Sequence, residues 1–545
     1  MSLPLRSARF LIPAAMLTAS PALAQTNEEL LRIIDQLQRR VEQLERAQRG
    51  AAPAPAVAAP ARRPAPPAAT APPAVAAAPR APVQAAQAAP IMPPAQTPEE
   101  RRAETRAAAI DALRGDLPNS IRIPGTETSV RVYGFVKANL FGDLNMVNRS
   151  DAPSVQATPL AGSAADQQSG DLQFSARRTR IGIESSTPAG DWGTFAARLE
   201  MDFAGNTPSA SATATNQGWN PRLRQAYVRL GGDVFSVLVG QADSLWNLAP
   251  VETLTDATFL NGSSVRQAQL RATGRLAPGL TGAVSIEAPY TDYTQNAAVL
   301  YPDSNLNGGA SPATSNWPDL LGKLTYAGEW GNVALTGMLR ELRIDTNGTD
   351  ATPKGVATGL GYGARLSTTL NMSTLASAFG ADDVTLLAYY GQGIGRYFDS
   401  TTSGQSAFSD LGLPGVVNVS LTPTPSWGVA GSYRHYWSTQ LRSNVGAAWA
   451  VVDVPAFVGG FTPGGSTTQT VNANMQMIVA NLIWSPFATE RNGRITTGSI
   501  DVGIEYQYYR RDMQGGAIAA NAPSGGTIGG YGIEQRIQMS LIGRF

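Results

Sequence analysis

Arginine is the residue type in this sequence whose number and spacing could do chemistry. A guanidinium stays charged at any physiological pH and can hold a carboxylate through two parallel hydrogen bonds, so a row of them could guide anions. Seven arginines at strand-like spacing are candidates for such a path: Arg178, Arg180, Arg198, Arg222, Arg224, Arg271 and Arg340. The alternative is that each one only neutralises a nearby carboxylate. The carboxylates at hand are Glu184, Glu200, Asp202 and Glu287.

The stretch from Trp246 to Ser264 has no strand alternation and carries two acidic residues, Glu252 and Asp256. If this stretch folds back between the strands, Glu252 and Asp256 supply the acidic side of a constriction opposite the arginines. The alternative is a loop that stays outside like its neighbours. The sequence leaves both readings open.

Catalytic chemistry has little material in this chain. It contains no Cys and a single His, His435, so neither a thiolate metal site nor a histidine cluster can be assembled. The carboxylates are scattered at strand spacing, with no pair assignable to acid and base roles. We therefore expect no metal, no cofactor and no enzymatic activity. The net charge of +1 also argues against a nucleic-acid partner.

The elements that would position the arginines are amphipathic strands in residues 130–545. In the sharpest one, the apolar row Phe195, Leu199 and Phe203 alternates with the charged row Arg198, Glu200 and Asp202. Charged residues make up only 15% of the chain, well below the usual share of soluble domains. Apolar rows facing lipid and charged rows facing a watery lumen are typical of a transmembrane β-barrel.

We predict about sixteen antiparallel strands. They lie near 130–144, 172–186, 193–203, 222–230, 234–244, 266–276, 280–288, 319–329, 332–344, 359–370, 383–393, 425–437, 440–453, 471–485, 498–511 and 531–545. Short connections alternate with long ones, the asymmetry of periplasmic turns and extracellular loops. Two stretches fit poorly: Arg177 and Arg178 are adjacent, so one of them breaks the alternation, and 234–244 fits either phase. The final strand ends on an aromatic residue, Phe545, as outer-membrane barrels do.

The amino-terminal part predicts export rather than membrane-spanning helices. Residues 1–24 resemble a signal peptide, with two arginines, a short apolar stretch and a small-x-small cleavage site. No later stretch approaches the ~18 consecutive apolar residues that a helical span requires. A barrel is then the structure that can sit in a bilayer.

Between the signal peptide and the barrel we expect a helical extension. Residues 25–49 carry about three heptads, which predict a coiled coil. Its a and d positions are Leu30, Ile34, Leu37, Val41 and Leu44. The pattern does not decide between two strands and three, and a single amphipathic surface helix is the alternative. An Ala/Pro-rich spacer over 50–96 and a short helix over 97–117 complete the extension.

The barrel region resembles the DcaP-like trimeric porins of Gram-negative outer membranes. The stretches that carry the resemblance are V-R-V-Y-G-F-V-K-A-N at 130–139, A-R-R-T-R-I-G-I-E at 176–184, L-R-Q-A-Y-V at 223–228, V-G-Q-A-D-S at 239–244, S-V-R-Q-A-Q-L-R at 264–271, G-I-G-R-Y at 393–397, R-H-Y-W at 434–437 and I-G-R-F at 542–545. The coil followed by a spacer is also similar to that family. The resemblance implies a homotrimer of sixteen-stranded barrels that passes small anionic solutes, including dicarboxylates.

The sequence is therefore interpreted as an outer-membrane porin for passive diffusion, with its amino-terminal extension in the periplasm. Its expected partners are outer-membrane lipid, further copies of itself and small anionic solutes. A structural barrel that anchors the periplasmic coil to the cell wall is the first alternative. A hydrolytic barrel is a second one, weakened by the single histidine.

Overall fold

The computed structural model describes most of the chain from residue 113 onwards. The described ranges are 113–205, 220–296, 312–347, 353–398, 405–460, 471–491, 493–514 and 529–545. The predicted signal peptide, coiled coil and spacer lie outside these ranges. So does most of the predicted helix over 97–117, and residues 113–117 form turns and a bridge rather than helix.

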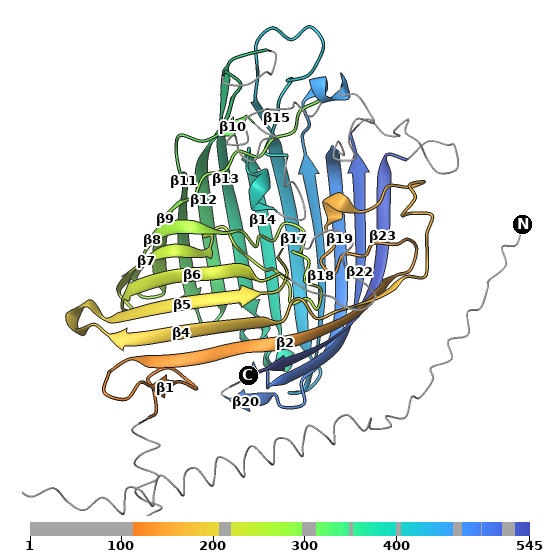
Figure 1. Ribbon diagram of the computed structural model, residues 1–545. Coiled ribbons are helices and arrows are strands. Elements are labelled where there is room, and N and C mark those ends of the chain that lie inside the picture. The colour runs from red at the N-terminus through yellow and green to blue at the C-terminus, as the bar shows by residue number, and fades with distance from the viewer. Residues whose placement is uncertain are drawn as a thin grey trace, which may run out of the picture. The chain divides into compact units, whose positions relative to one another are not determined.

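A single antiparallel sheet closes on itself to form a barrel (Figure 1). Its sixteen wall strands among the described residues are β2 (Ser129–Asp143), β4 (Arg180–Pro188), β5 (Thr194–Asp202), β6 (Arg222–Gly231), β7 (Phe235–Asp243), β8 (Arg266–Ala277), β9 (Leu280–Glu287), β11 (Asp319–Gly328), β12 (Gly331–Asp345), β13 (Val356–Asn371), β14 (Asp383–Gln392), β17 (Pro425–Tyr436), β18 (Leu441–Val452), β19 (Asn472–Trp484), β22 (Ile500–Met513) and β23 (Tyr531–Arg544). Closure comes from β2, which pairs with β4 on one side and with the last strand, β23, on the other.

Short strands add to this wall at its ends. β1 (Ile121–Arg122), β3 (Leu172–Ser175) and β10 (Ala313–Thr314) extend the main sheet. β15 (Ala407–Phe408) pairs with β16 (Thr422–Pro423), and β20 (Thr489–Arg491) with β21 (Arg494–Thr496). Across the described ranges we find no helix with the length and apolar character needed to span a bilayer.

The sequence-based prediction of about sixteen antiparallel strands is confirmed, with one correction. The stretch 172–186, predicted as one strand, is two strands, β3 and β4, separated by a turn at 176–179. The adjacent arginines explain the break: two consecutive charged side chains cannot both face the lumen within one strand. The turn places Arg177 and Arg178 on the same side, where both reach Asp151.

The two rows of each strand have the expected environments. The apolar row of β5 is exposed on the barrel exterior, with Leu199 at 42%, whereas Asp202 in the other row is buried at 1%. The ambiguous strand β7 exposes Phe235 and Val239 and buries Leu238. An exterior that exposes large aliphatic side chains on strand after strand is the surface a bilayer stabilises.

The connections fall into two classes at opposite ends of the barrel. Turns such as 232–234 and 278–279 are tight, whereas the connections that begin after β2, β7, β9 and β14 are long. In Figure 1 the long connections reach upward around β10 and β15, while β1 and β20 mark the end with short turns. This is the asymmetry predicted from the spacing of the strands.

Three of the long connections fold into the barrel instead of away from it. They contribute Val155, Trp246 and Phe398 to one buried apolar cluster, together with lumen-facing wall residues such as Tyr389 and Met477. Phe398 stacks on Tyr389 with ring centroids 4.2 Å apart, and Trp246 meets Phe398 edge-on at 5.9 Å. Part of the lumen beside β11–β19 is therefore a packed protein core rather than water.

Glycines in the lumen-facing rows make room for these loops. A Cβ at Gly428 would lie 2.6 Å from Asn261 Oδ1, and one at Gly446 would lie 3.2 Å from Phe259. A Cβ at Gly503 would lie 2.8 Å from Leu254 Cδ1. The wall strands carry glycine where the loop lies against them, so the sequence of the strands helps to determine the position of the loop.

Candidate functional site

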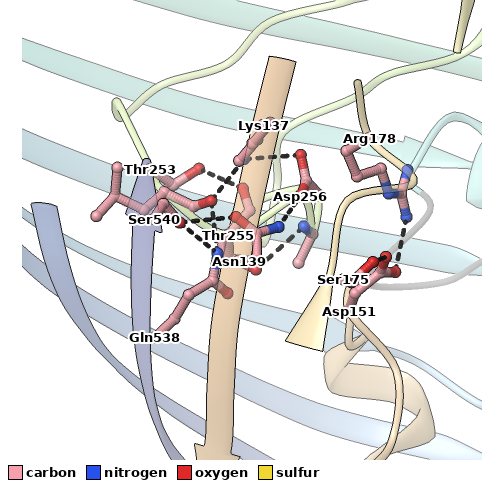
Figure 2. Close-up of polar contacts among 12 residues, drawn as sticks. Lys137, Asn139, Asp151, Ser175, Arg178, Thr253, Thr255, Asp256, Gln538 and Ser540 are labelled. Carbon is pink, nitrogen blue, oxygen red and sulfur yellow. Dashed lines mark hydrogen bonds and ion pairs between the residues drawn. The ribbon is translucent and has the colours of Figure 1, made fainter. Parts of the chain in front are cut away.

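The connection between β7 and β8, residues 244–265, crosses the lumen and is here called the inward loop. Lys137 of β2 donates to Leu254 O at 2.7 Å and to Asp256 Oδ1 at 2.9 Å. Asn139 donates to the other oxygen of Asp256 at 2.8 Å, and Gln538 of β23 also donates to Leu254 O. Figure 2 shows these side chains converging on the loop. The loop is thus tied to the strands where the barrel closes.

Two further anchors come from β22, the strand next to β23, and from β18, two strands further along the wall. Glu505 of β22 accepts the backbone N–H groups of Leu254 and Thr255, at 2.5 and 2.8 Å. Arg442 of β18 donates two hydrogen bonds, of 2.6 and 2.9 Å, to the carboxylate of Glu252. Burial alone would raise the pKa of Glu252, but the hydrogen bond and charge of Arg442 outweigh it and hold that pKa below its usual value. Glu252 is therefore ionised at neutral pH and serves as an anchor.

The connection after β2 also reaches the lumen and brings a buried carboxylate, Asp151. It pairs with Arg177, accepts a hydrogen bond from Ser175 at 2.9 Å and lies 3.5 Å from Arg178 (Figure 2). Burial would raise the pKa of Asp151, yet its hydrogen bond with Arg177 and the charge of Arg178 bring it below the ordinary value. The carboxylate thus fixes this loop against the turn that separates β3 from β4.

Between these two loops and the wall strands β4, β5 and β6 lies a polar cavity of about 380 Å³. Five arginines line it and are here called the upper arginine set: Arg178, Arg180, Arg222, Arg224 and Arg266. Two carboxylates, Asp202 and Asp256, also line it, so the lining carries an excess of positive charge. Phe259 and Val251 of the inward loop form its apolar side.

Within this cavity four of the five arginines are more accessible than the carboxylates that hold them. The exception is Arg266, which is 16% exposed beside Asp243 at 47%. Arg222 bonds Asp202 at 2.6 Å and is 34% exposed, whereas Asp202 is 1% exposed. Arg180 is 28% exposed and its partner Glu200 is 6% exposed, at 3.4 Å. Arg224 joins the two carboxylates, at 3.0 Å from Glu200 and 2.7 Å from Asp202. These buried carboxylates therefore orient the guanidiniums from the side away from the cavity. A solute in the cavity meets mainly hydrogen-bond donors and positive charge.

Of the seven arginines predicted from sequence, the structure brings four together at this cavity. These are Arg178, Arg180, Arg222 and Arg224. Arg198 lies elsewhere on β5, bonded to Glu184 at 3.0 Å and placed over the rings of Tyr133 and Tyr227. Of the two predicted acidic residues, Asp256 lines the cavity, but Lys137 and Asn139 occupy its carboxylate. Glu252 does not line it, because Arg442 holds it against β18.

The other two predicted arginines need separate accounts. Arg340 is a correction: its side chain is 0% exposed, enclosed by Asp292 at 3.3 Å, Asp319 at 3.6 Å and the carbonyl of Gly393 at 2.9 Å, so it stabilises the loop after β14. Arg271 lies on β8 outside the cavity and bonds the side chain of Gln269 at 2.7 Å.

Sequence reasoning missed three residues of the site: Arg266, Asp151 and Lys137. Lys137 is one of only three lysines in the chain and alternates with apolar neighbours, so its rarity was an available signal. Asp151 lies in a long connection with no periodicity, which left nothing to single it out. Within the described part of the chain no group of His, Asp or Glu side chains is arranged to hold a metal ion. His435 contacts Asp382 at 2.7 Å beside the short turns, far along the chain from the cavity strands.

A lumen narrowed by an inward loop and lined by arginines is the geometry of a diffusion channel, and the comparisons with known proteins agree. The family model described as "Porin subfamily" matches residues 121–507. The chain belongs to this porin family. The match covers the wall strands from β2 to β19 and part of β22, so membership rests on the barrel itself and not on one motif.

Curated relatives and a solved structure extend this result. Porin Omp2b of Brucella canis is 25% identical over 221 residues, which are 39% of this chain and 51% of the relative. Porin Omp2b of Brucella suis is 26% identical over the same shares. The matched part of the chain thus spans about half the length of these relatives. The crystal structure of the outer membrane channel DcaP of Acinetobacter baumannii covers 78% of this chain and 100% of its own, at 18% identity and a TM-score of 0.56.

The resemblance to the DcaP-like porins is therefore confirmed, with the solved structure sharing the barrel fold. The chain therefore has the family and the closed barrel fold of porins. They are the family and fold of a channel rather than of an enzyme.

Proposed function

We propose that this porin passes small hydrophilic anions, such as dicarboxylates, by passive diffusion through the arginine-lined cavity. The observation that carries the proposal is the upper arginine set, in which four of the five guanidiniums are more exposed than their carboxylate partners. A guanidinium fork suits a carboxylate, and several at one level lower the energy of an anion that has shed part of its hydration. A cation at the same place meets like charge.

Reversal potentials of the reconstituted protein in a salt gradient test this proposal. Neutralising Arg178, Arg180 and Arg224 together, as Arg→Gln, should lower the anion-to-cation permeability ratio by about fivefold. After screening, each charge ~8 Å from the path contributes on the order of 0.3 kcal/mol to the energy difference between an anion and a cation in the pore. Three such contributions add up to about a fivefold change in the ratio. The matched control neutralises Arg122, Arg491 and Arg494 in the short strands β1, β20 and β21, away from the cavity.

Two outcomes would contradict the proposal. An unchanged reversal potential in the triple variant would remove the upper arginine set from the selectivity of the pore. A wild-type protein that inserts into bilayers but conducts no current would instead favour the alternative of a structural barrel that anchors a periplasmic extension.

We also propose self-association into a homotrimer, supported by the unequal height of the barrel wall. β4, β5 and β7 have nine residues each and β9 has eight, whereas β12 has 15 and β13 has 16. The short strands are near the minimum length for crossing a bilayer. A second copy packed against that side would shield the low wall from lipid headgroups. In this arrangement the coiled coil predicted over 25–49 would lie in the periplasm.

A further inference from the structure

A second group of cations lines the lumen outside the upper cavity. Its members, here called the lower cation set, are Arg271 of β8, Lys323 of β11 and Arg365 of β13. Lys323 is directly opposite Thr336 of β12, and Thr336 is opposite Arg365, so these three residues form one row across three strands. The neighbours Leu320 and Leu324 are exposed on the exterior, which puts Lys323 on the lumen side. On β13 the even-numbered residues from 360 to 366 are exposed and Arg365 is buried, so Arg365 also faces the lumen.

The lower cation set differs from the upper set in having no carboxylate partner. Within the described ranges, none of its three members forms an ion pair, and Lys323 forms no hydrogen bond with protein. Arg365 is 1% exposed and donates to the carbonyl of Trp246, with its guanidinium 5.0 Å from that ring. Its Nε and Nη2, and the hydroxyl of Thr336, reach no acceptor in the same ranges.

Burying these cations without counter-charges costs free energy when the lumen holds only neutral water. A buried charge is normally paired, and a buried guanidinium with unmet donors loses hydration without compensation. Arg271, also half-buried, adds a further positive charge two strands from Lys323, through Ser285 and Leu321 of the same ladder. An anion beside Lys323 would offset all three charges at once.

We infer that the lower cation set is a second binding site for a small carboxylate or inorganic oxyanion, in series with the upper cavity. Lys323 is the group that contacts the anion, because its side chain is half-buried and unoccupied by protein partners. Arg365, enclosed beneath Trp246, acts as a fixed charge behind it. Arg266 of the upper set and Arg271 of the lower set lie five residues apart on β8, about 17 Å of strand, so an anion would pass from one site to the other.

Two sites in series suit conduction. Each can bind an anion strongly enough to draw it in, and occupancy of one site by a second anion helps the first to leave. The inference rests on the proposed anion preference, but it assigns a function to residues outside the upper cavity. It also predicts a direction: the lower set lies nearer the short turns, so anions that enter from that side meet it first.

The test is single-channel current of the full chain in planar bilayers with potassium succinate as the probe. Lys323→Gln should lower the succinate current at subsaturating concentration by about threefold, as expected for loss of one ion-pair contact, and raise the half-saturating concentration. The effect should be larger when succinate is added on the short-turn side. Lys323→Arg should retain most of the current. The matched control is Lys354→Gln, which removes the same charge from an exposed position in the connection between β12 and β13.

The outcomes separate this inference from the proposed function. If wild type prefers anions and Lys323→Gln carries the same succinate current as Lys354→Gln, the second site is refuted while the upper arginine set stands. If wild type itself shows no anion preference, the proposed function fails. The shift in electrophoretic mobility on heating checks the folding of each variant independently, so a loss of current through misfolding is recognised. If Lys323→Gln misfolds, Lys323→Arg tests the inference, because it should fold and retain most of the succinate current.

Discussion

At the level of single side chains, the order of charges matters more than their number. Arginine and carboxylate alternate around the upper cavity, so a count of charges along the strands suggests near neutrality. The structure places the carboxylates behind and the guanidiniums in front, as with Asp202 behind Arg222. An ion that passes responds to the groups it can approach, because the nearer charge contributes more to its energy.

Asp151 gives a prediction at this scale, because it masks arginine charge next to the cavity. In Asp151→Asn, Arg177 and Arg178 lose their shared carboxylate, so the anion-to-cation permeability ratio should rise by about twofold, from one additional unscreened charge. Removing one partner of a buried pair also costs on the order of 3 kcal/mol locally, so the loop after β2 should exchange its amide hydrogens faster. Reversal potentials and hydrogen exchange measure the two effects.

The same residue predicts a pH dependence. Its folded pKa is below the ordinary value, so the ion pair is present above the unfolded pKa of 3.8 and is lost as the pH falls through the lower, folded pKa. Selectivity in wild type should therefore be insensitive to Asp151 between pH 7 and pH 5 and change only in stronger acid. A change centred above pH 5 that disappears in Asp151→Asn would contradict this assignment.

Individual residues also show the limits of prediction from sequence. Alternation identified the lumen-facing arginines of β5 and β6 because the pattern is local and has a period of two. It missed Arg266, which falls in the same row as the exterior Leu270 but sits at the first residue of β8, beside the inward loop. It misplaced Arg340, whose burial depends on Asp292 and on the loop after β14, contacts distant in sequence.

At the level of elements, the strands were predictable and the loops were not. Strand boundaries follow from alternation and turn residues within about ten residues of chain. The path of the inward loop depends instead on Lys137, Glu505 and Arg442, each more than 100 residues away from the group it binds. Gly428, Gly446 and Gly503 have no distinguishing feature in the sequence, and their role becomes visible only when the inward loop that packs against them is known.

Gly428 provides a test of how the wall accommodates the inward loop. Gly428→Val should push Asn261 away from the wall, where it now donates to Val429 O and Trp449 O at 2.8 Å each. Overpacking of this kind costs about 1–3 kcal/mol, so the loop should loosen while the barrel remains closed. We expect a larger and noisier single-channel conductance.

Gly322 supplies the matched control, because a Cβ there would meet nothing within 4 Å. Gly322→Val should leave the conductance unchanged, and both variants should retain the heat-dependent mobility shift of a folded barrel. Equal conductance in Gly428→Val and Gly322→Val would mean that the inward loop does not limit the current.

At the level of the whole molecule, the barrel has two unlike halves. One half, from β12 onwards, has mostly long strands, and its lumen side packs against loops to form the apolar cluster with Tyr389 and Met477. The other half, β4 to β8, has mostly short strands and carries the arginines around an open cavity. The proposed solute path therefore runs along the side of the barrel whose strands are short, the same side that is proposed above for contact between copies.

This arrangement leads to a prediction about assembly. Leu199 on the short strand β5 and Leu335 on the long strand β12 are both exterior leucines, exposed by 42% and 52%. If the low wall is the subunit interface, Leu199→Arg buries an unpaired charge between copies and should dissociate the oligomer. Leu335→Arg instead faces lipid, where an arginine costs about 2–4 kcal/mol near the midplane, so it should weaken the barrel but leave the oligomer intact.

Sedimentation in detergent measures the oligomer, and urea unfolding in vesicles measures the barrel. A monomeric wild type, or dissociation by Leu335→Arg alone, would move the interface away from the arginine side and with it the proposed shielding of the short strands.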